Sequence, residues 1–154
     1  MRVKTKMNFQ ITKAKTDYQI TTAVNDIYQD IVKNKKLFET MYHFWALGLV
    51  YGILHKKEYK KARSADIIRI QQIHDETITD VINICYSILD DGKGEKGERE
   101  VFNKMLSHAD AGVVELTKLY EKNGSFILPV VLEDAKEIWA TRVKELHNIN
   151  LEDL

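Results

Sequence analysis

An uncharged segment in the first third of the chain limits which folds this sequence can adopt. Residues 40–55, "TMYHFWALGLVYGILH", contain no Asp, Glu, Lys or Arg. A membrane-spanning helix needs about 20 consecutive, mostly apolar residues, and this segment is shorter and carries Tyr and His side chains. A helix that is apolar on nearly every side is instead typical of the centre of a helical protein. We therefore expect a central helix over residues 37–57 and no membrane segment.

Two glycines interrupt this apolar segment one helical turn apart, so both lie on one face of the expected helix. A glycine inside a helix costs about 1 kcal/mol relative to alanine, and a pair at this spacing lets a second backbone approach closely. One interpretation, which we favour, is tight packing inside the domain. The other is an interface with a partner protein or with a second copy of the chain. The candidate interface residues are Trp45, Gly48 and Gly52.

Apolar residues at three- and four-residue spacing recur along most of the chain, which predicts an all-α fold, a compact bundle of five to six helices. The sole proline, Pro129, leaves room for long helices. The segment "SADIIRIQQIHDET", which starts at Ser64, fits either a short strand or a helix, and its capping residues favour the helix. The other expected helices cover residues 17–33, 37–57, 76–89, 98–122 and 130–147.

The length and the charges of the chain fit one ordinary soluble domain. With 154 residues, a single domain is expected, with a basic arm over residues 1–15, a helical domain over 16–148 and an acidic tail over 149–154. Lys+Arg and Asp+Glu both number 23, so the net charge is zero, which argues against coating nucleic acid through bulk charge. The basic start lacks the apolar core of a secretory signal, and one cysteine, Cys85, cannot form an internal disulfide. We expect a cytoplasmic protein.

A dense basic cluster follows the uncharged segment at once. The functional interpretation is contact with the phosphate backbone of DNA, where each neutralised phosphate releases counterions. The alternative, which we favour on the sequence alone, is a solvated helix end, because lysines are favourable near a helix C-terminus. The candidate nucleic-acid-binding residues are Lys56, Lys57, Lys60, Lys61 and Arg63.

The sequence offers little support for catalysis. The five histidines form neither an H-E-x-x-H motif nor a paired Cys/His zinc spacing, so we expect no metal and no cofactor. Two R-x4-H pairs resemble the R-x4-6-H motif of all-α HEPN domains, a family that includes many ribonucleases. The residue after each Arg is apolar here, whereas that family typically has a polar one. The candidate catalytic residues under this resemblance are Arg69, His74, Arg142 and His147.

A longer pattern resembles small bacterial proteins associated with Dnd systems, which carry out DNA phosphorothioation and the linked defence against foreign DNA. It consists of "LFETMYHFWALGLVYGILHKKEYKKA" and the later "EREVFNKMLSHADAGVVELTKLY". The resemblance implies an accessory subunit, not a known enzyme, that binds a larger protein of a modification or anti-phage complex, and it carries over no catalytic residue. DNA and a second copy of the chain are further candidate partners. A HEPN-type ribonuclease and a stand-alone DNA-binding regulator stay open as alternatives.

Overall fold

A computed structural model describes residues 9–90 and 97–124 of the chain. The chain divides into two units, Met1–Glu115 and Leu116–Leu154, and the boundary falls inside the long helix α5, Glu98–Asn123. In the second unit the structure describes the last turns of α5 and Gly124. This glycine has a φ of 72° and donates its N–H to the carbonyl of Tyr120 over 2.8 Å, which is a common way to end a helix.

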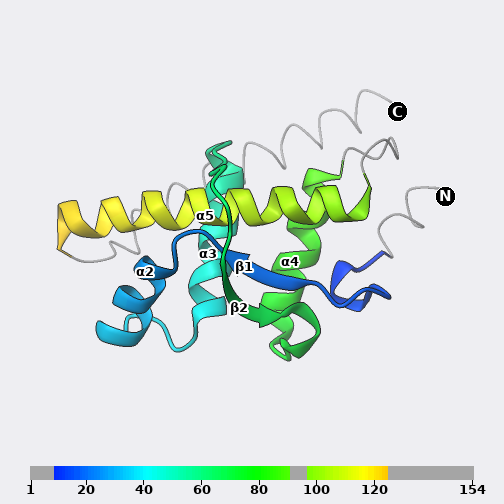
Figure 1. Cartoon of the computed structure of the whole chain (residues 1–154), viewed down its shortest axis with the longest axis horizontal. Helices are drawn as coiled ribbons and strands as arrows, with labels where there is room; N and C mark the ends of the chain where they lie inside the picture. Colours follow the sequence, from blue (N-terminus) through cyan, green and yellow to red (C-terminus); the bar gives the residue numbers. More distant parts are fainter. Residues whose placement is uncertain (1–8, 91–96, 125–154) are drawn as a thin grey trace, which may run out of the picture. The chain divides into compact units, whose positions relative to one another are not determined.

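The described part of the chain is largely α-helical, as the sequence predicts (Figure 1). It contains four α-helices and a two-stranded sheet, so the expected count of five to six helices is not met. None of the described helices is both long enough and apolar enough to cross a membrane. The α-helices are α2 (Asn25–Tyr28), which continues as a π-helix over Gln29–Asn34, α3 (Met41–Leu54), α4 (Glu76–Leu89) and α5.

The first strand of the sheet was not expected, and the second was one of two alternatives for its segment. Strand β1, Gln19–Thr22, pairs antiparallel with β2, Ala65–Arg69, in the first unit (Figure 1). The prediction of one helix over residues 17–33 is therefore wrong for its first part, because pairing with a segment distant in sequence overrides the local helical spacing. Side chains alternate in burial along β1, which is the period of a strand. For the segment that begins at Ser64, the strand was the correct alternative.

The core of the first unit forms where α3 meets α5. Figure 1 shows α5 running across α3 and α4. Phe44, Trp45 and Leu49 of α3 are fully buried, as are Phe102 and Met105 of α5. Burial on nearly all sides explains why α3 needs no polar face, as predicted for the uncharged segment.

Capping residues set the bounds of α3 and α4. Helix α3 begins after Thr40, whose Oγ1 accepts a hydrogen bond from the His43 N–H over 3.2 Å. It ends at Leu54, and Lys56 then adopts a φ of 54°, so the helix is shorter than the predicted 37–57. Helix α4 has the predicted bounds, and the Asp75 side chain accepts from the Ile78 N–H over 3.2 Å. The helix expected over residues 130–147, the acidic tail and most of the basic arm lie outside the described residues.

Candidate nucleic-acid interface

The glycine face of α3 packs against α5 of the same chain. A Cβ added at Gly52 would overlap the carbonyl oxygen of His108, and one added at Gly48 would lie 2.8 Å from the carbonyl oxygen of Ala109. Gly112 of α5 supplies the other half of the contact, because a Cβ there would overlap the carbonyl oxygen of Gly48. Trp45 is fully buried as well. Trp45, Gly48 and Gly52 are therefore buried inside the fold of this chain.

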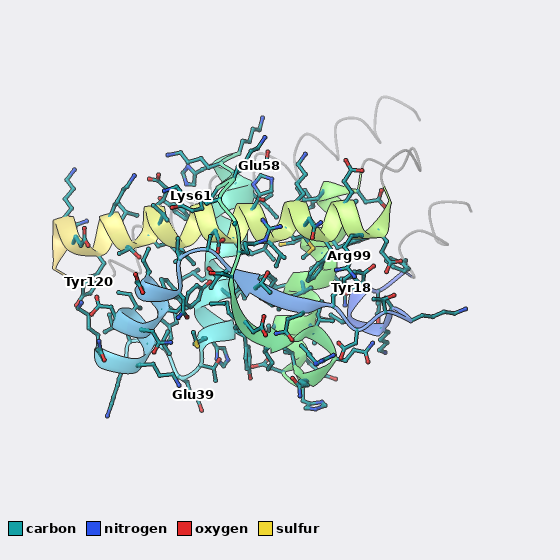
Figure 2. The ribbon with its side chains drawn as sticks, in the orientation of Figure 1. Tyr18, Glu39, Glu58, Lys61, Arg99 and Tyr120 are labelled. Carbon is teal, nitrogen blue, oxygen red and sulfur yellow. The ribbon has the colours of Figure 1, made fainter. Side chains whose placement is uncertain are left out.

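This close approach places the segment after α3, which carries Glu58 and Lys61, alongside α5 (Figure 2). The Tyr59 N–H donates to the carbonyl oxygen of Ser107 over 3.0 Å, and the Arg63 guanidinium donates to the Ser107 Oγ over 3.2 Å. The His108 Nδ1 lies 2.6 Å from the Lys57 carbonyl oxygen and donates to it, since a carbonyl oxygen only accepts. Three contacts thus hold residues 57–63 against α5, although these residues form no helix or strand.

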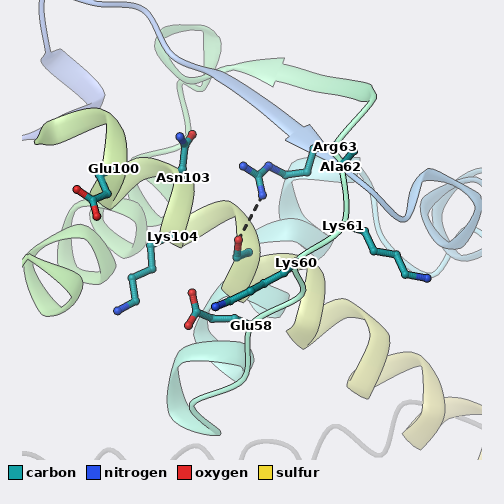
Figure 3. Close-up of a pocket in the computed structure, with 9 residues that line it drawn as sticks. Glu58, Lys60, Lys61, Ala62, Arg63, Glu100, Asn103 and Lys104 are labelled. Carbon is teal, nitrogen blue, oxygen red and sulfur yellow. Dashed lines mark hydrogen bonds between the residues drawn. The ribbon is translucent and has the colours of Figure 1, made fainter. Parts of the chain in front are cut away.

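A hollow of about 570 Å³ lies between this segment and α5 (Figure 3). Its lining carries four cationic and two anionic side chains, so its net charge is +2. We call it the basic hollow. Figure 3 shows Arg63 pointing toward α5, where it meets Ser107, whereas Lys61 points away from the hollow. The segment after α3 contributes Glu58, Lys60, Lys61, Ala62 and Arg63, and α5 contributes Glu100, Asn103, Lys104 and Ser107.

The positive charge of Arg63 also acts on a buried carboxylate, that of Asp110. Asp110 is fully buried and accepts hydrogen bonds from the Thr22 Oγ1 over 2.5 Å and from the Ala23 N–H over 2.9 Å. Burial raises the pKa of Asp110, while those two hydrogen bonds and the positive charge of Arg63 lower it. The guanidinium thus favours the ionised form of this carboxylate. The exposed Lys60 and the half-buried Lys104 are the cations best placed to meet an anion.

The predicted basic cluster contributes only part of the basic hollow. Lys60, Lys61 and Arg63 line it, whereas Lys57 forms an ion pair with Glu115 over 3.1 Å and Lys56 is exposed outside the lining. Sequence reasoning missed the residues that α5 supplies. Their signal is a polar stripe at three- and four-residue spacing on an otherwise amphipathic helix, formed by Glu100, Asn103, Lys104 and Ser107.

The first R-x4-H pair does not lie on a helix. Arg69 ends strand β2, and its guanidinium lies 3.7 Å from an Asp17 carboxylate oxygen. His74 is exposed between a short 3-10 turn and α4. Arg142 and His147, the second pair, lie outside the described residues. In the described part of the chain, the Arg69 side chain thus forms an ion pair with Asp17 at the surface.

A second polar cluster, also missed by sequence reasoning, joins the starts of α3 and α4. The Thr40 Oγ1 lies 2.6 Å from the His43 Nδ1, and the His43 Nε2 lies 3.3 Å from an Asp75 carboxylate oxygen. The hydrogen bond from the Ile78 backbone is the main cause that lowers the pKa of Asp75. Both Thr40 and Asp75 cap helices, so the cluster has a structural role. No group of three or more metal-ligating side chains occurs among residues 9–90 and 97–124.

Comparison with protein-family models, with curated proteins and with solved structures finds no match.

Proposed function

We propose that this protein is a helical accessory subunit of a bacterial DNA-modification or anti-phage system, in which it contacts the phosphate backbone of DNA through the basic hollow. The observation that carries the proposal is a local net charge of +2 on a chain whose overall formal charge is zero. The resemblance to Dnd-associated proteins supports the setting. A cytoplasmic location and a larger protein partner belong to the same proposal.

The chemistry of the basic hollow suits phosphate contact rather than base reading. Lysine ammonium groups bind phosphate as point charges, and Lys60 and Lys104 approach the hollow from its two sides. The amide of the exposed Asn103 can donate to a phosphate oxygen. Phosphate contacts position a protein on DNA without reading its sequence. Glu58 and Glu100 oppose the anion, so the contact is weak and fits a subunit whose partner supplies further affinity.

The lining also favours binding over catalysis. It contains no histidine or cysteine, and its one hydroxyl, the Ser107 Oγ, accepts a hydrogen bond from Arg63. Cys85 lies on α4, and burial raises the pKa of its thiol to about 12. A thiol with so high a pKa is a poor nucleophile. The basic hollow therefore offers cations, an amide and two carboxylates, and neither a histidine nor a cysteine is among its lining residues.

The DNA contact is tested by fluorescence anisotropy with a labelled DNA duplex at low salt. The double substitution Lys60→Glu with Lys104→Glu should weaken binding by about tenfold or more, because it turns two attractive charges into repulsive ones. Lys33→Glu is the matched control, since Lys33 is an exposed lysine outside the hollow. Equal losses for the double variant and for the control would refute a localised contact.

The partner is tested by purifying the tagged full-length protein from its native host with and without nuclease treatment. A larger protein that co-purifies in stoichiometric amount after nuclease treatment supports the accessory role. Recovery of nucleic acid alone would favour a stand-alone DNA-binding protein, and recovery of neither would refute both. The molar mass of the purified protein in solution decides whether it is a homo-oligomer.

A further inference from the structure

Helix α4 carries an apolar stripe on its solvent side. Its core side is formed by Ile78, Ile82, Cys85 and Tyr86, all of them buried. On the other side, Ile84 is 46% and Ile88 is 52% exposed, the highest values among the large hydrophobic residues of the described part. The half-buried Val81 extends the stripe at helical spacing. Contiguous apolar side chains left open on a surface are a candidate contact surface.

The charges beside this stripe are all acidic. No Lys or Arg occurs from residue 70 to residue 92. Glu76 and Asp80 are exposed on the helix next to the stripe, and neither takes part in the ion pairs formed among the described residues. We define the α4 face by five residues, which are Glu76, Asp80, Val81, Ile84 and Ile88. It combines apolar side chains that water solvates poorly with carboxylates that lack a cation.

We propose that the α4 face is the docking surface for a basic, amphipathic helix of a partner protein. Such a helix lays its apolar face into a complementary apolar surface, and its Lys and Arg side chains would pair with Glu76 and Asp80. The α4 face from Glu76 to Ile88 spans about 18 Å at 1.5 Å per residue, which accommodates about three turns of a helix. The inference rests on the accessory role proposed above and specifies the chemistry of the partner.

The charges also disfavour two other occupants of this face. A second copy would place Glu76 and Asp80 of both chains in one interface with no Lys or Arg from either α4, and like charges across an interface oppose association. An anionic membrane surface would be repelled for the same reason. Opposite charge therefore selects a basic partner. The basic hollow and the α4 face share no residue, so DNA and protein can be bound by separate surfaces.

The test uses the full-length protein and a labelled synthetic peptide of about 18 residues, a length at which an amphipathic helix forms readily. The peptide carries Leu on one face and Lys on the other, and a twin peptide carries Glu in place of every Lys. We expect the Lys peptide to bind and the Glu peptide to bind at least about tenfold more weakly, since only the Lys peptide complements Glu76 and Asp80.

Substitutions on the α4 face test whether the Lys peptide binds there. Ile84→Ser combined with Ile88→Ser should weaken binding of the Lys peptide by about tenfold or more, because it removes apolar area that the peptide would cover. Asp80→Lys should weaken it through charge. Leu37→Ser is the matched control, since Leu37 is a large apolar residue that is 41% exposed outside α4. Because all these side chains are exposed, thermal unfolding should show that each variant still folds.

Three results would overturn the inference. The first is equal binding of the two peptides, and the second is unchanged binding by the Ile84 and Ile88 variant. The third is a dimer, seen by sedimentation, that this variant dissolves, which would make a second copy the occupant. DNA affinity of the same variants separates this inference from the proposed function. Lys60→Glu with Lys104→Glu should reduce DNA binding and leave peptide binding intact, and the Ile84 and Ile88 variant should do the reverse.

Discussion

Gly112 meets α3 through backbone atoms alone. A Cβ at this position would overlap the Gly48 carbonyl oxygen and lie 2.8 Å from the Gly52 nitrogen. Both are backbone atoms of a buried helix, so no flexible side chain can move aside. The sequence predicted a close approach at Gly48 and Gly52, but it could not show which helix approaches. Helical spacing identifies the face of a helix and not the partner that packs on that face.

Gly112→Ala should therefore force α3 and α5 apart. Overpacking of this kind costs about 1–3 kcal/mol, and the backbone clash places the variant at the upper end. The measurement is urea unfolding followed by circular dichroism, with Gly97→Ala as the control because a Cβ at Gly97 meets nothing within 4 Å. If both variants lost the same free energy of unfolding, the result would contradict the packing of α3 on α5.

Asp110 is the buried carboxylate that ties α5 to β1. Burial raises its pKa, against the opposing effects of the bonds from Thr22 and Ala23 and of Arg63. A folded-state pKa above the unfolded value means that the folded state binds the proton more tightly. The contribution of Asp110 to stability is then fully present below the unfolded pKa and is lost as the pH rises through the folded pKa. Its neighbours in space were not predictable, because Thr22 lies on the unforeseen strand β1.

The direction of the pKa shift of Asp110 can be tested with Asp110→Asn, which keeps an acceptor oxygen and removes the charge. The free energy of unfolding of the variant minus that of the wild type should increase as the pH rises from about 4 to 7, since only the wild type ionises a buried group over this range. Urea titrations at several pH values measure it. A difference that is constant or that decreases with pH would show that Asp110 has no raised pKa.

At the scale of elements, local signals were sufficient where a helix carries its own cap. Helix α4 has the predicted bounds because Asp75 caps it and its apolar residues keep one period. The local pattern of residues 19–22 predicts a helix, since Ile20 continues the spacing of the apolar residues after it. The strand exists because its partner, residues 65–69, completes its hydrogen bonds. The local pattern of residues 19–22 did not indicate this pairing, whereas the segment from Ser64 fitted a strand as one of two alternatives.

Thr40 determines where α3 starts, and its hydroxyl also contacts His43, which reaches Asp75 at the start of α4. Thr40→Ala should cost about 1 kcal/mol of stability, the usual loss for an N-cap. Thr40→Ser should keep most of it, because serine retains the accepting oxygen. Thermal unfolding of both variants checks this result. Equal melting temperatures for the alanine variant and the wild type would show that the cap contributes nothing.

At the scale of the whole molecule, the net charge is zero, but the positive and negative charges lie on different surfaces. The cations after α3 gather at the basic hollow, and α4 has acidic residues only. The sequence identified the basic half of the candidate site, since residues 56–63 are contiguous. It missed the half from α5, because Asn103 and Lys104 join the hollow only through the packing of α3 on α5. Contiguous charges can be read from a sequence, and a surface that two elements build cannot.

The separation of charge sets the expected salt dependence of DNA binding. Arg63 is engaged with Ser107 and Lys61 points away from the hollow (Figure 3), so Lys60 and Lys104 remain to neutralise about two phosphates. The logarithm of the affinity for duplex DNA should then fall against the logarithm of salt concentration with a slope of about −1.8. Lys104→Gln should make the slope shallower by about one unit, while Lys33→Gln, outside the hollow, should leave it unchanged. Anisotropy titrations at four or more salt concentrations give the slopes. A wild-type slope steeper than about −5 would require more phosphate contacts than the basic hollow can make, and DNA would then bind over a wider surface than the one proposed.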